Sequence, residues 1–178
     1  MRITPGASDA DDGLMPRSRL SGLLLGALAL ASCAMNDPPG DAPLEDPTSV
    51  TPSGKPNRFL LCPDAVCTAP ADSVSPTFQM PREQLEQAWL AMMRAQPRAE
   101  LLAEDAARHL YLFRQRSAVF RFPDLISVRF LDVGGGASTL AVYSRSVYGT
   151  YDFGVNRRRV EDWIGQLEAR LGQVAAGR

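Results

Sequence analysis

The sequence has 178 residues, 45% of them hydrophobic and 22% charged, which is enough for one domain with a buried core but too short for two domains of ordinary size. Its 19 basic and 20 acidic side chains nearly cancel, which argues against a strongly basic nucleic-acid-binding protein. Because 10 of the 14 prolines lie between Pro38 and Pro81, we expect distinct segments along the chain.

An export signal is predicted at the start of the chain. Arg17 and Arg19 precede residues 20–32, a run without charges that ends in small side chains, and this is the layout of a secretory signal peptide. The run is shorter than the roughly 20 apolar residues that span a bilayer, so a cleaved signal is favoured over an uncleaved anchor. We assign residues 1–32 to the signal and, because three aspartates precede it, expect translation to begin at Met15.

The signal ends in Leu30-Ala31-Ser32-Cys33, which resembles the lipobox of bacterial lipoproteins. The resemblance implies that Cys33 carries the lipid, palmitate included, and binds the protein to a membrane. Ala34 is not the aspartate that resembles an inner-membrane retention signal, so the expected place is the outer membrane, facing the periplasm. The alternative is that Cys33 is only a small apolar residue that ends the hydrophobic run.

Residues 33–59 are predicted to form a flexible, lipid-anchored linker. They are rich in proline and small polar residues, and they hold too little apolar surface to offset the entropy of ordering. Such a stretch is extended and semi-stiff, and it would hold a folded domain away from the lipid headgroups.

Cys62 and Cys67 form an even pair in an exported chain, where disulfides persist, so we predict a disulfide between them. Free thiols and a metal site are the alternatives. The two cysteines and the single histidine, His109, would supply at most three zinc ligands. We therefore predict neither a metal nor a cofactor.

Residues 60–175 are predicted to form a single α+β domain. A helix is expected to start at Pro81 and to stop before Pro97, because Leu85, Trp89 and Met92 fall on one helical face with Ala88. A second helix is expected over residues 157–171, with Asn156 as its N-cap. Its buried stripe comprises Val160, Trp163, Ile164, Leu167 and Leu171.

Strands are expected between the two helices, over residues 100–103, 109–116, 125–132 and 139–145. The last two alternate apolar and polar residues around the glycines at 134–136 and predict a hairpin. Its register places Phe130 opposite Leu140, Val128 opposite Val142 and Ile126 opposite Ser144. The predicted fold is an antiparallel sheet of about four strands with both helices packed on one face.

The candidate functional segment is residues 143–159, between the last strand and the last helix. It places three arginines in the first turn of a helix, where the helix dipole is positive, so negative partners are expected nearby. These are either internal carboxylates (Asp124, Asp152, Glu161 and Asp162) or an external anion held by arginine side chains and helix N–H groups. The candidate binding residues are Ser144, Arg145, Ser146, Asp152, Asn156, Arg157 and Arg158.

Three motifs in this order, CPDAVC at 62–67, FRFPDL at 120–125 and SRSVYGTYDFGVNRRR at 144–159, resemble the domain-of-unknown-function family 1499. The similarity covers roughly residues 60–171, and the first motif departs from the usual form at Ala65 and Val66. The resemblance supports the domain boundaries and implies no activity.

We therefore expect a non-catalytic, lipid-anchored envelope protein that is structural or binds an envelope protein or a small anion through residues 143–159. The alternative is a hydrolase or other enzyme centred on the same loop. Its triad would combine His109 with Asp152 and either Ser144 or Ser146. Neither serine lies in the Gly-x-Ser-x-Gly elbow that exposes a nucleophile, so no catalytic residue is assigned.

Overall fold

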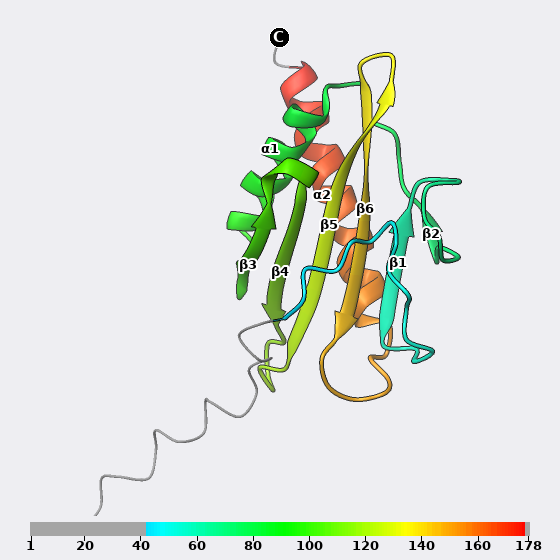
Figure 1. The fold of residues 1–178 in the computed structure, drawn as a ribbon. Helices are drawn as coiled ribbons and strands as arrows, with labels where there is room; N and C mark the ends of the chain where they lie inside the picture. Colours follow the sequence, from blue (N-terminus) through cyan, green and yellow to red (C-terminus); the bar gives the residue numbers. More distant parts are fainter. Residues whose placement is uncertain (1–41, 177–178) are drawn as a thin grey trace, which may run out of the picture. The chain divides into compact units, whose positions relative to one another are not determined.

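The structure, a computed structural model, describes residues 42–176. This part of the chain contains six strands and two long helices (Figure 1). The strands are β1 Arg58–Cys62, β2 Ser73–Val74, β3 Ala99–Asp105, β4 Leu110–Arg116, β5 Pro123–Gly134 and β6 Ala137–Ser146, and the helices are α1 Arg82–Arg94 and α2 Val155–Ala176. A short 3-10 helix, Ala106–Arg108, joins β3 to β4. The predicted signal peptide, Met15 and Cys33 lie outside the described residues.

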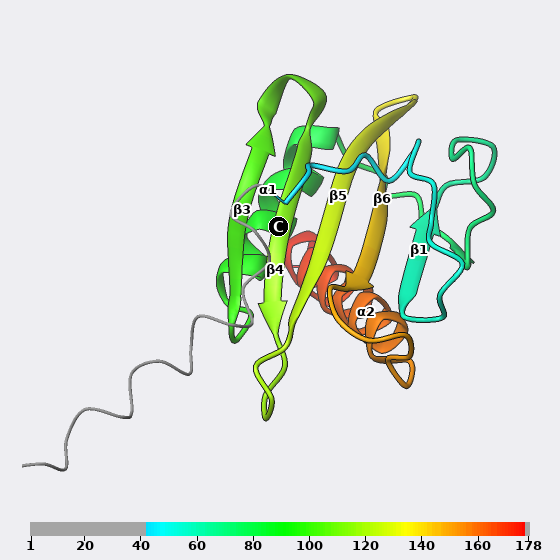
Figure 2. The same ribbon diagram turned by 60° about the horizontal axis from the view of Figure 1, so that its bottom comes forward.

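One sheet contains all six strands in the order β2-β1-β6-β5-β4-β3, and both helices cover the same face of it (Figures 1 and 2). The predicted hairpin is confirmed in register, because Phe130 pairs with Leu140, Val128 with Val142 and Ile126 with Ser144. The tight turn uses positive φ at Gly135 and Gly136, which glycine adopts without steric cost. The α+β class is confirmed.

The expectation of about four antiparallel strands is wrong, because the sheet has six strands and the β1–β2 pair is parallel. Strand β1 was missed because it is buried on both faces and so lacks a two-residue alternation. Phe59 and Leu61 belong to the main core under the helices, whereas Leu60 and Cys62 belong to a second cluster on the opposite face. Strand β2 is only two residues long and has no pattern of its own.

Both predicted helical stripes are buried against the sheet. Trp89 on α1 lies at the centre, with its ring 6.3 Å from Phe130 on β5 and 6.0 Å from Trp163 on α2. These edge-to-face contacts join the two helices to each other and to the sheet. Within residues 42–176, neither helix combines the length and apolar character that crossing a bilayer requires.

The second face of the sheet is partly covered by a segment that was predicted to be linker. Asp46 pairs with Arg129 on β5, Glu45 pairs with Arg145 on β6, and Val50 is buried in the second cluster. Figure 2 shows this segment, in cyan, crossing the strands. Residues 45–59 therefore belong to the domain, because ion pairs and one buried valine compensate for their low apolar content. The domain begins near residue 45 rather than at 60.

The structure places a disulfide between Cys62 and Cys67, whose Cα atoms are 6.2 Å apart. It joins the end of β1 to the loop that leads to β2. Residues 35–178 form one compact unit, and its sheet, both hydrophobic clusters and the disulfide are made entirely by residues 45–171. The part of the chain after the predicted lipid site thus contains everything its core requires.

Candidate functional site

The arginines of the predicted segment have internal partners. Arg159, on the first turns of α2, forms an ion pair with Asp124 near the start of β5, and their side chains are only 7% and 8% exposed. Its Nε donates to Gln115 Oε1 at 2.7 Å, and its Nη1 donates to Asn156 Oδ1 at 2.7 Å and Ser144 Oγ at 3.1 Å. We call this group of five side chains the Arg159 network.

Asn156 connects the Arg159 network to the loop and to β1. Besides accepting from Arg159, its Oδ1 accepts from Ser144 Oγ at 2.7 Å. Its Nδ2 donates to the Asn57 carbonyl oxygen at 3.0 Å, Ser146 Oγ at 3.1 Å and Asp152 Oδ2 at 2.7 Å. The amide is fully buried, so every one of these bonds replaces a bond to water.

The prediction that Asn156 is the N-cap of the last helix is wrong. Helix α2 begins at Val155, and the carboxylate of Asp152 accepts hydrogen bonds from the backbone N–H groups at the N-terminal end of the helix. Asp152 Oδ1 accepts from Gly154 N and its Oδ2 from Asn156 N, both at 2.9 Å. A carboxylate at this position satisfies free N–H groups and offsets the positive helix terminus, which leaves Asn156 free to turn inward.

Arg145 lies on the opposite face of the sheet from the Arg159 network and takes no part in it. Its Nε donates to Glu45 Oε2 at 2.7 Å. The neighbouring Tyr143 is buried there, and burial together with the charge of Glu45 raises the pKa of its hydroxyl. Arg158 is exposed and donates to the Phe153 carbonyl oxygen at 2.9 Å. The predicted internal carboxylates therefore pair with Arg159, through Asp124, and with Arg157, through Glu161, whereas Arg158 bonds a backbone carbonyl and Arg145 pairs with Glu45.

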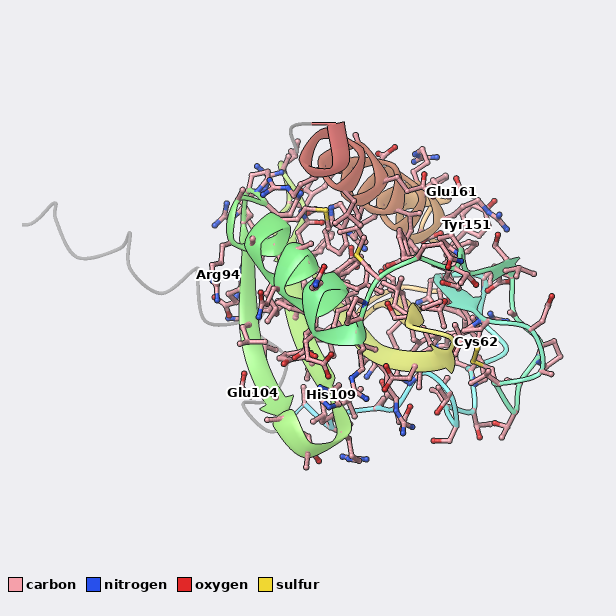
Figure 3. The ribbon with its side chains drawn as sticks, turned by 90° about the horizontal axis from the view of Figure 1, so that it is seen from above. Cys62, Arg94, Glu104, His109, Tyr151 and Glu161 are labelled. Atoms are coloured by element: carbon pink, nitrogen blue, oxygen red, sulfur yellow. A yellow bond between two sulfur atoms is a disulfide. The ribbon has the colours of Figure 1, made fainter. Side chains whose placement is uncertain are left out.

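Arg157 pairs with Glu161 and also lines a cavity. A pocket of about 410 Å³ lies between the N-terminal end of α2 and the segment before β1. We call it the basic pocket, and it is lined by Gly54, Lys55, Pro56, Arg58, Phe59, Asp72, Tyr151, Asp152, Gly154 and Arg157. The guanidinium of Arg157 lies 4.6 Å from the centroid of the Phe59 ring and 3.4 Å from Glu161. Figure 3 shows where Tyr151 and Glu161 lie relative to α2.

The two carboxylates that line the basic pocket, Asp72 and Asp152, already accept hydrogen bonds from the protein. Asp72 pairs with Arg58 and also accepts from the backbone N–H of Leu60 at 2.8 Å, and Asp152 caps α2. Lys55 is exposed and, among the described residues, has no ion-pair partner. Arg58 and Arg157 each pair with one carboxylate, Asp72 and Glu161, so Lys55 is the cation of this pocket that no carboxylate of the described residues pairs with.

The residues of the predicted triad are not brought together. His109 Nδ1 lies 2.8 Å from Glu86 Oε2 on α1, and Tyr111 bonds the other oxygen of the same carboxylate. Burial and Glu86 raise the pKa of Tyr111 well above its usual value. Ser144 lies two strands away from His109 and about 13 Å further along the sheet. Figure 3 shows His109 far from Tyr151, which marks the loop.

Of the seven predicted binding residues, only Asp152 and Arg157 line the basic pocket; Ser144 and Asn156 belong to the Arg159 network, and Ser146 accepts a hydrogen bond from Asn156. Sequence reasoning missed Lys55, Arg58 and Tyr151 as pocket residues, because Lys55 and Arg58 lie in the stretch that was taken for linker. No group of three or more potential metal ligands occurs within residues 42–176.

The fold and the site define an α+β domain with a buried ionic network beside a small cationic pocket. The chain belongs to the family described as "Protein of unknown function (DUF1499)", whose model matches residues 45–167. This match begins where the segment that crosses the second face begins. A search among curated proteins gave no match.

Proposed function

We propose that this protein is a lipid-anchored component of the cell envelope that binds a small anion in the basic pocket. The observation that carries the anion proposal is the convergence of Lys55, Arg58 and Arg157 on one cavity, where Arg58 and Arg157 each pair with a single carboxylate and Lys55 has no ion-pair partner among the described residues. An arginine side chain offers a planar, bidentate donor set that suits carboxylates and phosphates. The volume of about 410 Å³ suits a small ligand.

The anion proposal predicts that binding depends on Arg157. Phosphate, sulfate and small carboxylates are to be screened by thermal shift, and at least one is expected to raise the unfolding temperature of the wild-type protein. Arg157→Ala should weaken the binding of that anion about tenfold or more, since a charged hydrogen bond contributes about 1.5–3 kcal/mol. Arg170→Ala is the matched control, because Arg170 is an exposed arginine on the same helix and is outside the pocket. An equal response in both variants, or no response to any anion, would reject the proposal.

The lipid anchor is supported by the complete signal and the lipobox-like end at Cys33. Two or three acyl chains would hold the protein permanently, since each buried methylene contributes about 0.8 kcal/mol. In cells fed labelled palmitate, Cys33→Ala should abolish incorporation, whereas a Cys62→Ala/Cys67→Ala double variant should retain it. Labelling that survives Cys33→Ala would contradict the assignment. We place the protein in the outer membrane, facing the periplasm.

A further inference from the structure

The two loops at one end of the sheet expose a group of aromatic rings. Residues 117–122 join β4 to β5 and residues 147–154 join β6 to α2, and both loops leave the same end of the sheet (Figures 1 and 2). The Val147 N–H donates to the Pro123 carbonyl oxygen at 3.2 Å, and the Phe122 and Tyr148 rings are 6.4 Å apart. We call Phe120, Phe122, Tyr148, Tyr151 and Phe153 the aromatic cap.

The rings of the aromatic cap stand outside the core. Phe120 is 70% exposed, Tyr151 62% and Phe153 78%. The rings form two contacting groups at the surface: Phe120 stacks on Phe122 at 5.7 Å and Phe122 meets Tyr148, and Tyr151 meets Phe153 at 5.1 Å. Exposed apolar side chains that gather in this way mark an interaction surface.

The backbone holds this arrangement in unfavourable conformations. Arg121 and Phe153 have φ of 58° and 54°, in the left-handed region that glycine adopts freely and bulky side chains avoid. Glycines occupy the same region at 149 and 154, on either side of Phe153. A large ring at a position better suited to glycine indicates that the ring itself is useful there.

The accessible charge around the aromatic cap is positive. Arg121, Arg157 and Arg158 are exposed in or beside the two loops. The carboxylate of these loops is Asp152, which caps α2; Asp124 on β5 is buried with Arg159, and Arg157 pairs with Glu161. Arg121 and Arg158 are the exposed cations that no described carboxylate pairs with, so this end of the domain complements an anionic surface.

We propose that the aromatic cap docks the domain onto an anionic lipid bilayer, with its rings in the headgroup region and the arginines on lipid phosphates. Tyrosine and tryptophan concentrate at membrane interfaces, and basic residues near the surface are attracted to anionic lipids. Phe120 and Phe153, the two most exposed rings, project from the loops, which suits insertion into a deformable surface, and Tyr151 also lines the basic pocket. The aromatic cap is expected to bind the bilayer by itself, so the proposal does not depend on acylation of Cys33.

The test measures sedimentation of a chain that starts at Met35, the compact unit described above, with vesicles of phosphatidylcholine alone or mixed with phosphatidylglycerol. The wild-type chain should bind the mixed vesicles, and less so at high salt. Phe120→Ala/Phe153→Ala should weaken binding at least tenfold. Leu101→Ala/Val133→Ala is the matched control, because both side chains are about half exposed and lie outside the two loops. Circular dichroism and thermal unfolding check that all variants fold.

Equal binding by the wild-type chain and the Phe120→Ala/Phe153→Ala variant would overturn the proposal, as would failure of the wild-type chain to bind the mixed vesicles. Self-association of the wild-type chain that only this variant abolishes would identify a second copy as the occupant and would also overturn it. Arg157→Ala separates this proposal from the anion pocket, because it should weaken the binding of soluble anions about tenfold or more and weaken vesicle binding only in part.

Discussion

Replacing Arg159 with alanine is expected to lower the free energy of unfolding by about 3–5 kcal/mol, because it leaves Asp124 as a buried, unpaired charge. The two side chains are 7% and 8% exposed, so water cannot readily replace the lost partner. The guanidinium also bonds Gln115, Ser144 and Asn156. Urea denaturation followed by the fluorescence of the buried Trp89 and Trp163 measures the loss.

Arg158→Ala is the matched control for Arg159, because Arg158 is the adjacent residue but is exposed and bonds only a backbone carbonyl in the described part of the chain. It should change the free energy of unfolding by no more than about 0.5 kcal/mol. Replacing both Asp124 and Arg159 with leucine should cost less than Arg159→Ala alone, since no unpaired charge remains. A loss below about 1 kcal/mol in Arg159→Ala would show that the Arg159 network does not hold the domain together.

Asn156→Ala is expected to cost about 3 kcal/mol. The buried amide bonds side chains of β6, α2 and the loop, and the backbone of Asn57 before β1. Its removal leaves several buried polar groups without partners, and each unsatisfied group costs about 1–3 kcal/mol. The same urea titration measures the effect, with Gln166→Ala, an exposed amide on the same helix, as the control.

The effects of Asn156→Ala and Arg159→Ala should not add, because the two side chains are directly bonded. The double variant is expected to be more stable than the sum of the single losses implies, by about 1 kcal/mol or more. Additivity within about 0.3 kcal/mol would mean that the two residues act independently and that the shared hydrogen bond contributes little.

The strongest local patterns predicted their elements well. The register of the β5–β6 hairpin was predicted to the residue, since one face of each strand is apolar and a slip by one residue would turn that face to water, although both strands are longer than the predicted 125–132 and 139–145. The helical stripes through Trp89 and Trp163 were predicted for the same reason. Strand β1 gave no such signal, because a strand that is buried on both faces has no alternation to detect.

The candidate site was predicted only in part. The sequence placed arginines in the first turn of a helix and required negative partners for them, with Asp124 and Asp152 among the candidates. Which arginine meets which partner depends on strand pairing: Asp124 is 35 residues from Arg159, and Glu45 is 100 residues from Arg145. Spacing along the chain carries no information on such contacts, so the pairing could not be assigned from the sequence.

The sequence by itself determined the α+β class, the hairpin register, the two buried helical faces and the pair of cysteines, because each follows from local periodicity or composition. Tertiary structure alone decided that residues 45–59 belong to the domain, that Asn156 turns inward, and that Arg157 faces a cavity while Arg159 is buried. These outcomes depend on which distant segments share a face of the sheet. Only folding decides which segments share a face. It also removes water from the charges that these segments bring together, so those charges must pair.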